Sequence, residues 1–115
     1  MMIKFFRSGL QADMQPERRI KMVVLNVHYF TKPGKRAEFY EAVNKLEVPQ
    51  KSRAEEGNIK YDYYMSIDNE DEILLVENWK DEAAFRFHTE QAHFKALGEL
   101  KAEYVEETVL KRYEG

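Results

Sequence analysis

The sequence predicts an α+β domain in which helices cover one face of a four-stranded antiparallel sheet. Four segments have the composition or the period-two alternation of strands, two regions between them have helical spacing, and turn residues separate these segments. The resulting order of strand, helix, strand, strand, helix, strand is the ferredoxin-like βαββαβ arrangement. With 115 residues, the chain has room for one such domain and little room for a second.

The first half of the domain should contain a strand, a broken helix and a second strand. Residues 22–31 are mostly β-branched, aromatic or aliphatic, which predicts a buried strand. Apolar residues recur at helical spacing over 39–46, and Pro49 should break or bend this helix before Gly57-Asn58 ends it. Residues 59–67 alternate apolar and polar side chains and therefore predict a strand.

The second half should add a hairpin partner, two helices and a last strand. Residues 68–71 have the composition of a hairpin turn, and 73–79 form the strand that follows it. Asp81 is a suitable N-cap for a short helix, and a further helix is expected over about residues 91–104. Residues 105–113 then close the domain as the fourth strand.

Composition narrows the possible functions. The chain contains no Cys, which excludes disulfides, thiolate nucleophiles and Cys-based metal sites. Its net charge is -3, and Lys and Arg are scattered among Asp and Glu without forming a basic stripe. We therefore expect no nucleic-acid partner.

The N-terminal segment differs from the rest of the chain. Regular patterning begins near Lys21, so residues 1–20 are expected to be an N-terminal arm or extension, and 21–115 the domain. No apolar run reaches the length of a signal-peptide core or of a membrane span. We therefore expect a cytoplasmic protein without a membrane partner.

Both faces of the first predicted strand carry large apolar side chains. Val24 and Phe30 point to one side, whereas Val23, Leu25 and Val27 point to the other. Helices on one face leave the opposite face as an exposed apolar patch, and such patches usually mark interfaces. The sequence therefore predicts a homodimer joined sheet to sheet into an α+β barrel.

Polar side chains occupy positions in the two strands expected at the centre of the sheet. Asn26 and His28 lie two residues apart on the first strand, and Glu77 and Trp79 repeat this relation on the third. The two pairs could meet across one patch if they share a face. They would then form either a closed hydrogen-bond cluster or the wall of a pocket.

Two further histidines lie in the helical region after the third strand. His88 and His93 are five residues apart, which separates them by about 140° on an uninterrupted helix, although a break at 89–91 would change this. No HxH or HxxxH pair is present, so we expect no metal site. Aromatic residues, Tyr61 and Trp79 among them, could line a cavity for a flat ring.

Several motifs occur together at a characteristic spacing. Residues 77–85 contain E-x-W followed by an acidic turn, and His88 and His93 form an H-x4-H motif followed by hydrophobic residues. Glu56-Gly57-Asn58 precedes a Tyr-rich strand, and Asn26 lies on the first strand. This pattern, which extends from Met22 to about Tyr113, resembles the antibiotic biosynthesis monooxygenase domain family.

The resemblance implies a dimer with a cavity between sheet and helices in each subunit. Several members of this family oxygenate quinols or polycyclic phenols with dioxygen and use no metal, flavin or haem. It therefore implies a small-molecule substrate and no cofactor. The implied catalytic residues are His28 as the base, Asn26 as a group that orients a substrate oxygen, and Glu77. The implied substrate-binding residues are Trp79, Tyr61, His88 and His93.

Two other branches of the family offer alternatives. Asn26-Val27-His28 with His88 and His93 resembles a branch that isomerises a phosphorylated dihydroxypentanedione, although that branch has Tyr at the position of Trp79. Such an enzyme needs a cation for the phosphate, for which Lys80, Lys95 and Arg86 are candidates. A haem-degrading branch is disfavoured, because His88 and Gly98 stand where it has a Trp and the haem-ligating His. A third alternative is a non-catalytic ligand-binding dimer.

Overall fold

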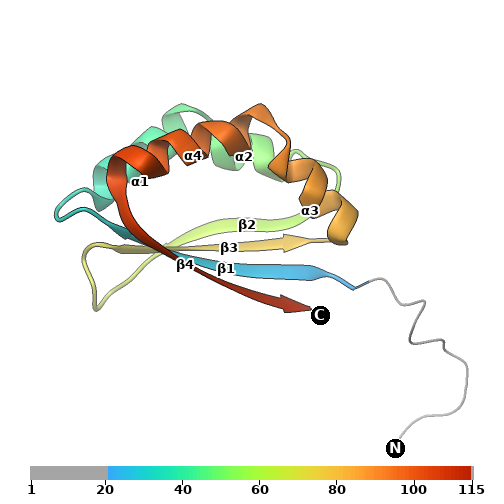
Figure 1. The fold of residues 1–115 in the computed structure, drawn as a ribbon, viewed down its shortest axis with the longest axis horizontal. Coiled ribbons are helices and arrows are strands. Elements are labelled where there is room, and N and C mark those ends of the chain that lie inside the picture. Colours follow the sequence, from blue (N-terminus) through green and yellow to red (C-terminus); the bar gives the residue numbers. More distant parts are fainter. Residues whose placement is uncertain (1–20, 115) are drawn as a thin grey trace, which may run out of the picture.

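The computed structural model describes residues 21–114, which form a sheet of four strands covered by four helices (Figure 1). The elements in chain order are β1 (Val23–Thr31), α1 (Arg36–Lys45), α2 (Val48–Arg53), β2 (Asn58–Met65), β3 (Glu72–Trp79), α3 (Glu82–Thr89), α4 (Ala92–Tyr104) and β4 (Val105–Glu114). All four helices lie on the same side of the sheet. The predicted ferredoxin-like α+β fold is confirmed.

The sheet has the order β2-β3-β1-β4, and every neighbouring pair is antiparallel. The expectation that the first and third strands are central is therefore confirmed. Alternate residues of β1 and β3 are buried against the helices, where Leu25 lies opposite Glu77 and Val27 opposite Leu75. Phe39 from α1 completes this core. We call the other surface of the sheet, which no helix among residues 21–114 covers, the open face (Figure 1).

The predicted break near Pro49 is confirmed. The chain leaves α1 at Leu46 and enters α2 through Glu47, which has a left-handed backbone with φ of 59°. Pro49 then sits in the first turn of α2, where its missing N–H costs nothing. This corner directs α2 toward the start of β2. There Gly57 packs so closely on α3 that a Cβ would overlap Ala84.

The second strand is shorter than its alternation predicts. The pairing of β2 with β3 shifts between Asn58 and Lys60, so Ile59 lies at an irregularity and is largely exposed. The strand ends at Met65, and Ile67 is 99% exposed in the following turn. The predicted strand over 59–67 is therefore confirmed only as far as Met65, and a bulge and a turn interrupt its alternation at the two ends.

The helix after β3 begins as predicted. The carboxylate of Asp81 caps α3 by accepting a hydrogen bond of 2.8 Å from the backbone N–H of Ala84. The helix ends at Thr89, and α4 begins at Ala92, so the conditional break between the two histidines is present.

Two expectations concern membranes and the N-terminus. Among residues 21–114, no helix is long and apolar enough to cross a membrane. The predicted N-terminal arm, residues 1–20, lies outside the described residues.

Candidate active site

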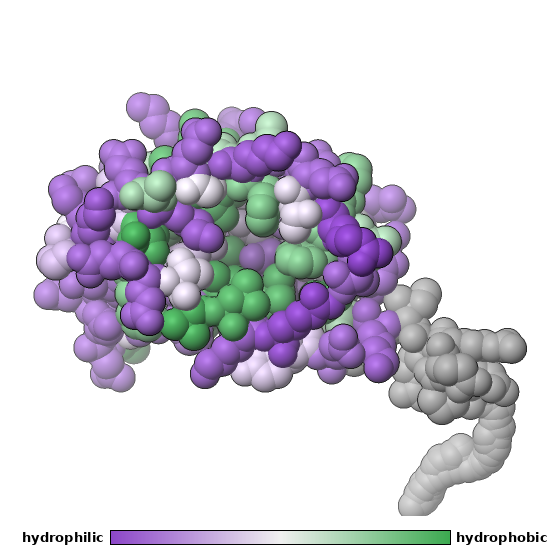
Figure 2. All heavy atoms as spheres, viewed as in Figure 1, coloured by the Kyte–Doolittle hydropathy of each residue, from purple (hydrophilic) through white to green (hydrophobic). Residues whose placement is uncertain are grey.

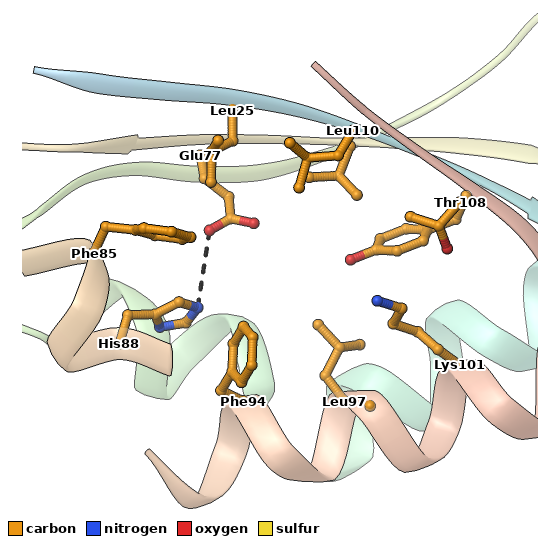
Figure 3. Close-up of a pocket in the computed structure, with 12 residues that line it drawn as sticks. Leu25, Glu77, Phe85, His88, Phe94, Leu97, Lys101, Thr108 and Leu110 are labelled. Atoms are coloured by element: carbon orange, nitrogen blue, oxygen red, sulfur yellow. Dashed lines mark ion pairs between the residues drawn. The ribbon is translucent and has the colours of Figure 1, made fainter. Parts of the chain in front are cut away.

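A pocket lies between the helix-covered face of the sheet and the last two helices. Its volume is about 150 Å³, and its lining comes from β1, β3, β4, α3 and α4. Most of the lining is apolar, with Phe85 and Phe94 at one end and Leu97 in the middle (Figure 3). In the space-filling view, hydrophobic residues surround a hollow in the near face, which is bordered by hydrophilic side chains (Figure 2).

One carboxylate projects into this apolar pocket. Glu77 lies on the central strand β3 and its side chain is 8% exposed. Its Oε1 accepts a hydrogen bond of 3.0 Å from the indole Nε1 of Trp79. Burial raises the pKa of Glu77 to about 7, against the Trp79 hydrogen bond that lowers it. Near neutral pH this carboxyl can therefore both give and take a proton.

One cation reaches the same pocket from the helix layer. Lys101 projects from α4, and Figure 3 shows its amine and the Glu77 carboxylate pointing into the cavity from different walls. The Lys101 Nζ lies 5.4 Å from the centre of the Tyr29 ring. Among the residues that the structure places, Lys101 is the one cationic side chain in the lining. The pocket thus offers a proton acceptor and a fixed positive charge in apolar surroundings.

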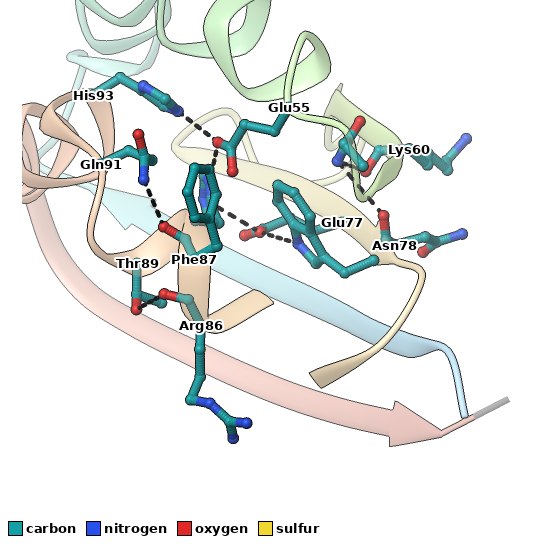
Figure 4. A network of polar contacts seen from close by, with 12 residues as sticks. Glu55, Lys60, Glu77, Asn78, Arg86, Phe87, Thr89, Gln91 and His93 are labelled. Atoms are coloured by element: carbon teal, nitrogen blue, oxygen red, sulfur yellow. Dashed lines mark hydrogen bonds and ion pairs between the residues drawn. The ribbon is translucent and has the colours of Figure 1, made fainter. Parts of the chain in front are cut away.

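Behind Glu77 lies a buried group of histidine and carboxylate side chains that we call the closed cluster: Glu55, Glu77, His88 and His93. Glu55, from the turn between α2 and β2, brings its Oε2 to 2.7 Å from His88 Nδ1 and 2.6 Å from His93 Nε2. The Nε2 of His88 faces Glu77 Oε1 at 3.8 Å. Contacts therefore run from His93 through Glu55 and His88 to Glu77, whose carboxylate lines the pocket; dashed lines in Figure 4 mark them.

His88 is the central member of the closed cluster. Its side chain is 1% exposed and its ring lies 4.4 Å from that of Trp79. Burial lowers the pKa of His88, although its hydrogen bond with Glu55 opposes this shift. The ring is therefore predominantly neutral at pH 7, with Nδ1 directed to Glu55 and Nε2 to Glu77.

Asn26 and His28 do not join this site. Both lie on the open face of the sheet, since the buried positions of β1 are the alternate residues Leu25 and Val27. His28 Nδ1 instead contacts Glu72 Oε2 at 2.8 Å, and we call these two residues the open-face pair. The two pairs could have met across one patch only if they shared a face, and this condition is not met, because Asn26 and His28 pair with Val76 and Leu74 rather than with Glu77 and face the opposite side of the sheet.

The other predicted site residues fall on the helix-covered side. His88 lines the pocket, whereas Trp79 and Tyr61 pack behind it, and the rings of Tyr61 and His88 are 5.9 Å apart. His93 lies beyond His88, in contact with Glu55. The break between α3 and α4 brings His88 and His93 together, so the spacing argument against neighbouring ligands was wrong.

Sequence reasoning missed Glu55 and Lys101. Lys101 shares a helical face with Phe94 and Leu97, at positions i+7, i and i+3, so its place on an apolar stripe was a usable signal. Glu55 had no such signal. It immediately precedes the Glu-Gly-Asn motif, but its contacts with His88 and His93 span 33 and 38 residues.

The fold and the site define a class of protein: a ferredoxin-like domain with a partly enclosed apolar pocket that contains one acidic and one basic group. A family model described as "Antibiotic biosynthesis monooxygenase" matches residues 22–100. The chain belongs to this family, as its motifs indicated.

Individual relatives agree with this assignment. A curated protein of Bacillus subtilis (strain 168), "Putative monooxygenase YcnE", is 46% identical over 76 residues, which are 66% of this chain and 78% of that protein. A solved structure titled "Putative antibiotic biosynthesis monooxygenase from Nitrosomonas europaea" is 26% identical with a TM-score of 0.76, covering 84% of this chain and 92% of that one. A structure from Bacteroides thetaiotaomicron VPI-5482, whose title describes a "Conserved Protein of Unknown Function" and adds "Possible Oxidoreductase", is 28% identical with a TM-score of 0.75, covering 84% of this chain and 100% of that one.

Proposed function

We propose that the protein is a monooxygenase that oxidises a small quinol or phenol with dioxygen in the pocket between sheet and helices. One observation carries this proposal: Glu77 presents a buried carboxylate to an apolar cavity that also holds the Lys101 amine. A phenol fits such a site, because its ring is apolar and its hydroxyl is a weak acid. Membership of the family supports the same reaction class.

The chemistry needs a base, a cation and exclusion of water. Glu77 removes a phenolic proton, and the resulting anion transfers one electron to dioxygen, so that no redox cofactor is required. The semiquinone and superoxide radicals combine into a ring peroxide. The peroxide then loses water, whose two hydrogens come from Glu77 and from the attacked carbon. Quinol plus dioxygen thus gives hydroxyquinone plus water. Lys101 stabilises the negative charge that develops on oxygen.

The size of the pocket favours a single ring. A cavity of about 150 Å³ is comparable with engineered apolar cavities that hold benzene. Phe85 and Phe94 offer faces or edges for a ring of that size. Within the proposed class, a monocyclic hydroquinone therefore fits better than a polycyclic phenol.

The base in this proposal is Glu77 rather than His28. His28 is separated from the cavity by the sheet, whereas His88 is placed to exchange a proton with Glu77. Asn26 likewise has no route to a ligand in this pocket from its own subunit. Their position favours a role in association between subunits.

We also propose that the protein is a homodimer joined through its open face. Half-buried apolar side chains cover this face, among them Val24, Phe30, Leu74, Val76 and Val109. An exposed patch of this kind is unusual for a monomer, and a second copy of the same sheet complements it.

The isomerase alternative has less support from the pocket. None of Lys80, Lys95 and Arg86 lines it; Arg86 pairs with Glu82 on α3 and Lys80 lies 3.7 Å from Glu56. A phosphate would then have only Lys101 as a cationic partner among the described residues. A dianionic phosphate usually receives several donors.

The test is oxygen uptake by the full chain after EDTA treatment, on a panel of monocyclic hydroquinones and phenols, with and without catalase. Wild type should consume one dioxygen per hydroxyquinone formed, and catalase should return no oxygen. Glu77→Gln should lower kcat/KM by about 10² to 10⁴, the range for loss of a general base.

His28→Gln is the matched control, since it alters a histidine that contacts a carboxylate on the other side of the sheet. It should leave kcat/KM within about twofold. Release of hydrogen peroxide would show that the protein oxidises the quinol to a quinone without inserting oxygen, and would overturn the monooxygenase proposal. Absence of uptake over the whole panel, or equal losses in both variants, would overturn the proposal.

A further inference from the structure

We propose that Glu55, His88 and His93 form a binding site for one divalent transition-metal ion of the zinc class. Their ligand atoms all lie within 4.8 Å of one another. Each comes from a different part of the fold: the turn between α2 and β2, the last turn of α3, and the first turn of α4. The three residues are held in place by tertiary structure rather than by a local sequence motif.

The geometry is close to that of a metal site. Zinc binds nitrogen and oxygen ligands at roughly 2.0 to 2.2 Å, which places tetrahedral ligand atoms about 3.4 Å apart. Here Glu55 Oε2 lies 2.7 Å from His88 Nδ1 and 2.6 Å from His93 Nε2. A shift of the carboxylate by less than about 1 Å admits the ion.

The second oxygen of Glu55 provides independent support. The Glu55 side chain is 6% exposed, and its Oε1 is buried without a hydrogen-bond partner among the described residues. A buried carboxylate oxygen without a partner is costly, and such atoms need an explanation. A bidentate Glu55 would use both oxygens, and with the two imidazoles it would supply four ligand atoms.

His88 also has the outer contact that metal-binding histidines usually make. Its Nδ1 faces Glu55, and its other nitrogen, Nε2, faces Glu77 Oε1 at 3.8 Å. Coordination at Nδ1 places the ring proton on Nε2, directed toward that carboxylate. A bound ion would therefore determine which proton His88 presents to the pocket.

One of these ligands, Glu55, borders the molecular surface. Glu55 lines a surface hollow bordered by Gly57, Lys80 and Phe87, which is separate from the pocket that contains Glu77. Two imidazoles and one carboxylate favour Zn²⁺, Co²⁺ or Ni²⁺ over Mg²⁺ or Ca²⁺, which prefer all-oxygen sites.

The test uses the full chain without a histidine tag, stripped with EDTA and titrated with Zn²⁺ by calorimetry. One Zn²⁺ per chain should bind, and Mg²⁺ should not. The ring of Trp79, the only tryptophan, lies 4.4 Å from the ring of His88, so its fluorescence should change over the same titration. Loss of a residue that only hydrogen-bonds to a metal ligand usually lowers metal affinity 10- to 100-fold. His93→Gln and Glu55→Gln each remove a ligand itself, so each should weaken Zn²⁺ binding at least about 100-fold.

His28→Gln is the matched control, because His28 is the one histidine of the chain outside the site, and it should bind Zn²⁺ like wild type. Co²⁺ bound to wild type gives a second readout that needs no variant, since four-coordinate Co²⁺ absorbs strongly in the visible range. A weak octahedral spectrum, binding below one equivalent, or equal affinity in His93→Gln and His28→Gln would overturn the metal site. Oxygen uptake by EDTA-treated protein tests the proposed function separately.

Discussion

The closed cluster and the open-face pair contain the same chemical contact in two different surroundings. In the closed cluster, His88 Nδ1 lies 2.7 Å from Glu55, and the two side chains are 1% and 6% exposed. In the open-face pair, His28 Nδ1 lies 2.8 Å from Glu72, and the side chains are 27% and 20% exposed. The contact distances barely differ, so burial and neighbouring groups account for what separates the two regions.

The neighbouring groups determine what each His–Glu contact can influence. In the closed cluster His88 lies between two carboxylates, with Nδ1 at 2.7 Å from Glu55 and Nε2 at 3.8 Å from Glu77, so a change of charge at Glu55 acts on groups that border the pocket. The open-face pair has an aromatic neighbour, Phe30, whose ring lies 6.5 Å from His28, and faces away from the pocket. A partly exposed pair of this kind contributes little to stability in a monomer. The proposed second copy of the sheet would give it a buried setting.

The largest expected effect is the loss of dimerisation when the open face is disrupted. Val76 lies at the centre of that face, so Val76→Asp would place one charge from each subunit into the proposed dimer interface. Association should weaken by about 100-fold or more. Light scattering after size exclusion should then report the 13.7 kDa monomer.

Ile67→Asp is the control for that variant, because Ile67 is the most exposed large apolar residue among residues 21–114 and lies between β2 and β3. It should leave the dimer intact. A wild-type protein that already runs as a monomer at micromolar concentration would contradict the sheet-to-sheet dimer.

The pH dependence of stability should distinguish the two regions next. Glu77 has a pKa of about 7 in the fold against 4.5 as the reference value, so the native state holds more protons than the unfolded state between these values. The free energy of unfolding therefore falls as pH rises through this window, and the penalty is complete above pH 7. Glu77→Gln removes the titrating group. Its free energy of unfolding, taken relative to that of wild type, should therefore rise by about 2 to 3 kcal/mol when the pH is raised from 5 to 8.

Urea unfolding of EDTA-treated proteins at the two pH values measures this effect. Glu72→Gln, which removes the carboxylate of the open-face pair, serves as the matched control and should keep the wild-type pH dependence attributable to Glu77. If wild type and Glu77→Gln respond equally to pH, Glu77 titrates as an ordinary carboxyl and is not a base poised near neutrality.

The fold was predictable because its signals are local. The alternation in β2, the Pro49 break and the Asp81 cap each lie within a few residues of the structure they specify. The limits of β2 were not predictable in the same way. A bulge at Ile59 depends on pairing with β3, which is a property of two strands rather than of one.

The site was only partly predictable because its geometry depends on strand parity and tertiary contacts. Glu77 and His88 were identified, but β1 is apolar on both faces, so its sequence does not show which face the helices cover. Asn26 and His28 were therefore placed with Glu77 although they lie on the opposite side of the sheet. Glu55 reaches the cluster from a turn, and no periodic pattern in a single sequence contains that information.

The smallest expected effect tests whether a partner covers the open-face pair. In the monomeric Val76→Asp background, Glu72→Gln should lower the free energy of unfolding by no more than about 1 kcal/mol, and added salt should reduce this loss, because the pair is partly exposed and screened. In the otherwise wild-type dimer, the same substitution leaves His28 without its carboxylate inside an interface, so the loss should exceed the monomer value and resist salt. Equal losses in the two backgrounds, measured by urea unfolding at matched protein concentration, would mean that a second copy does not cover His28 and Glu72. The open-face pair would then stay partly exposed in solution, unlike the closed cluster. Unequal losses would instead show that dimerisation buries the open-face pair, as folding within one chain buries the closed cluster.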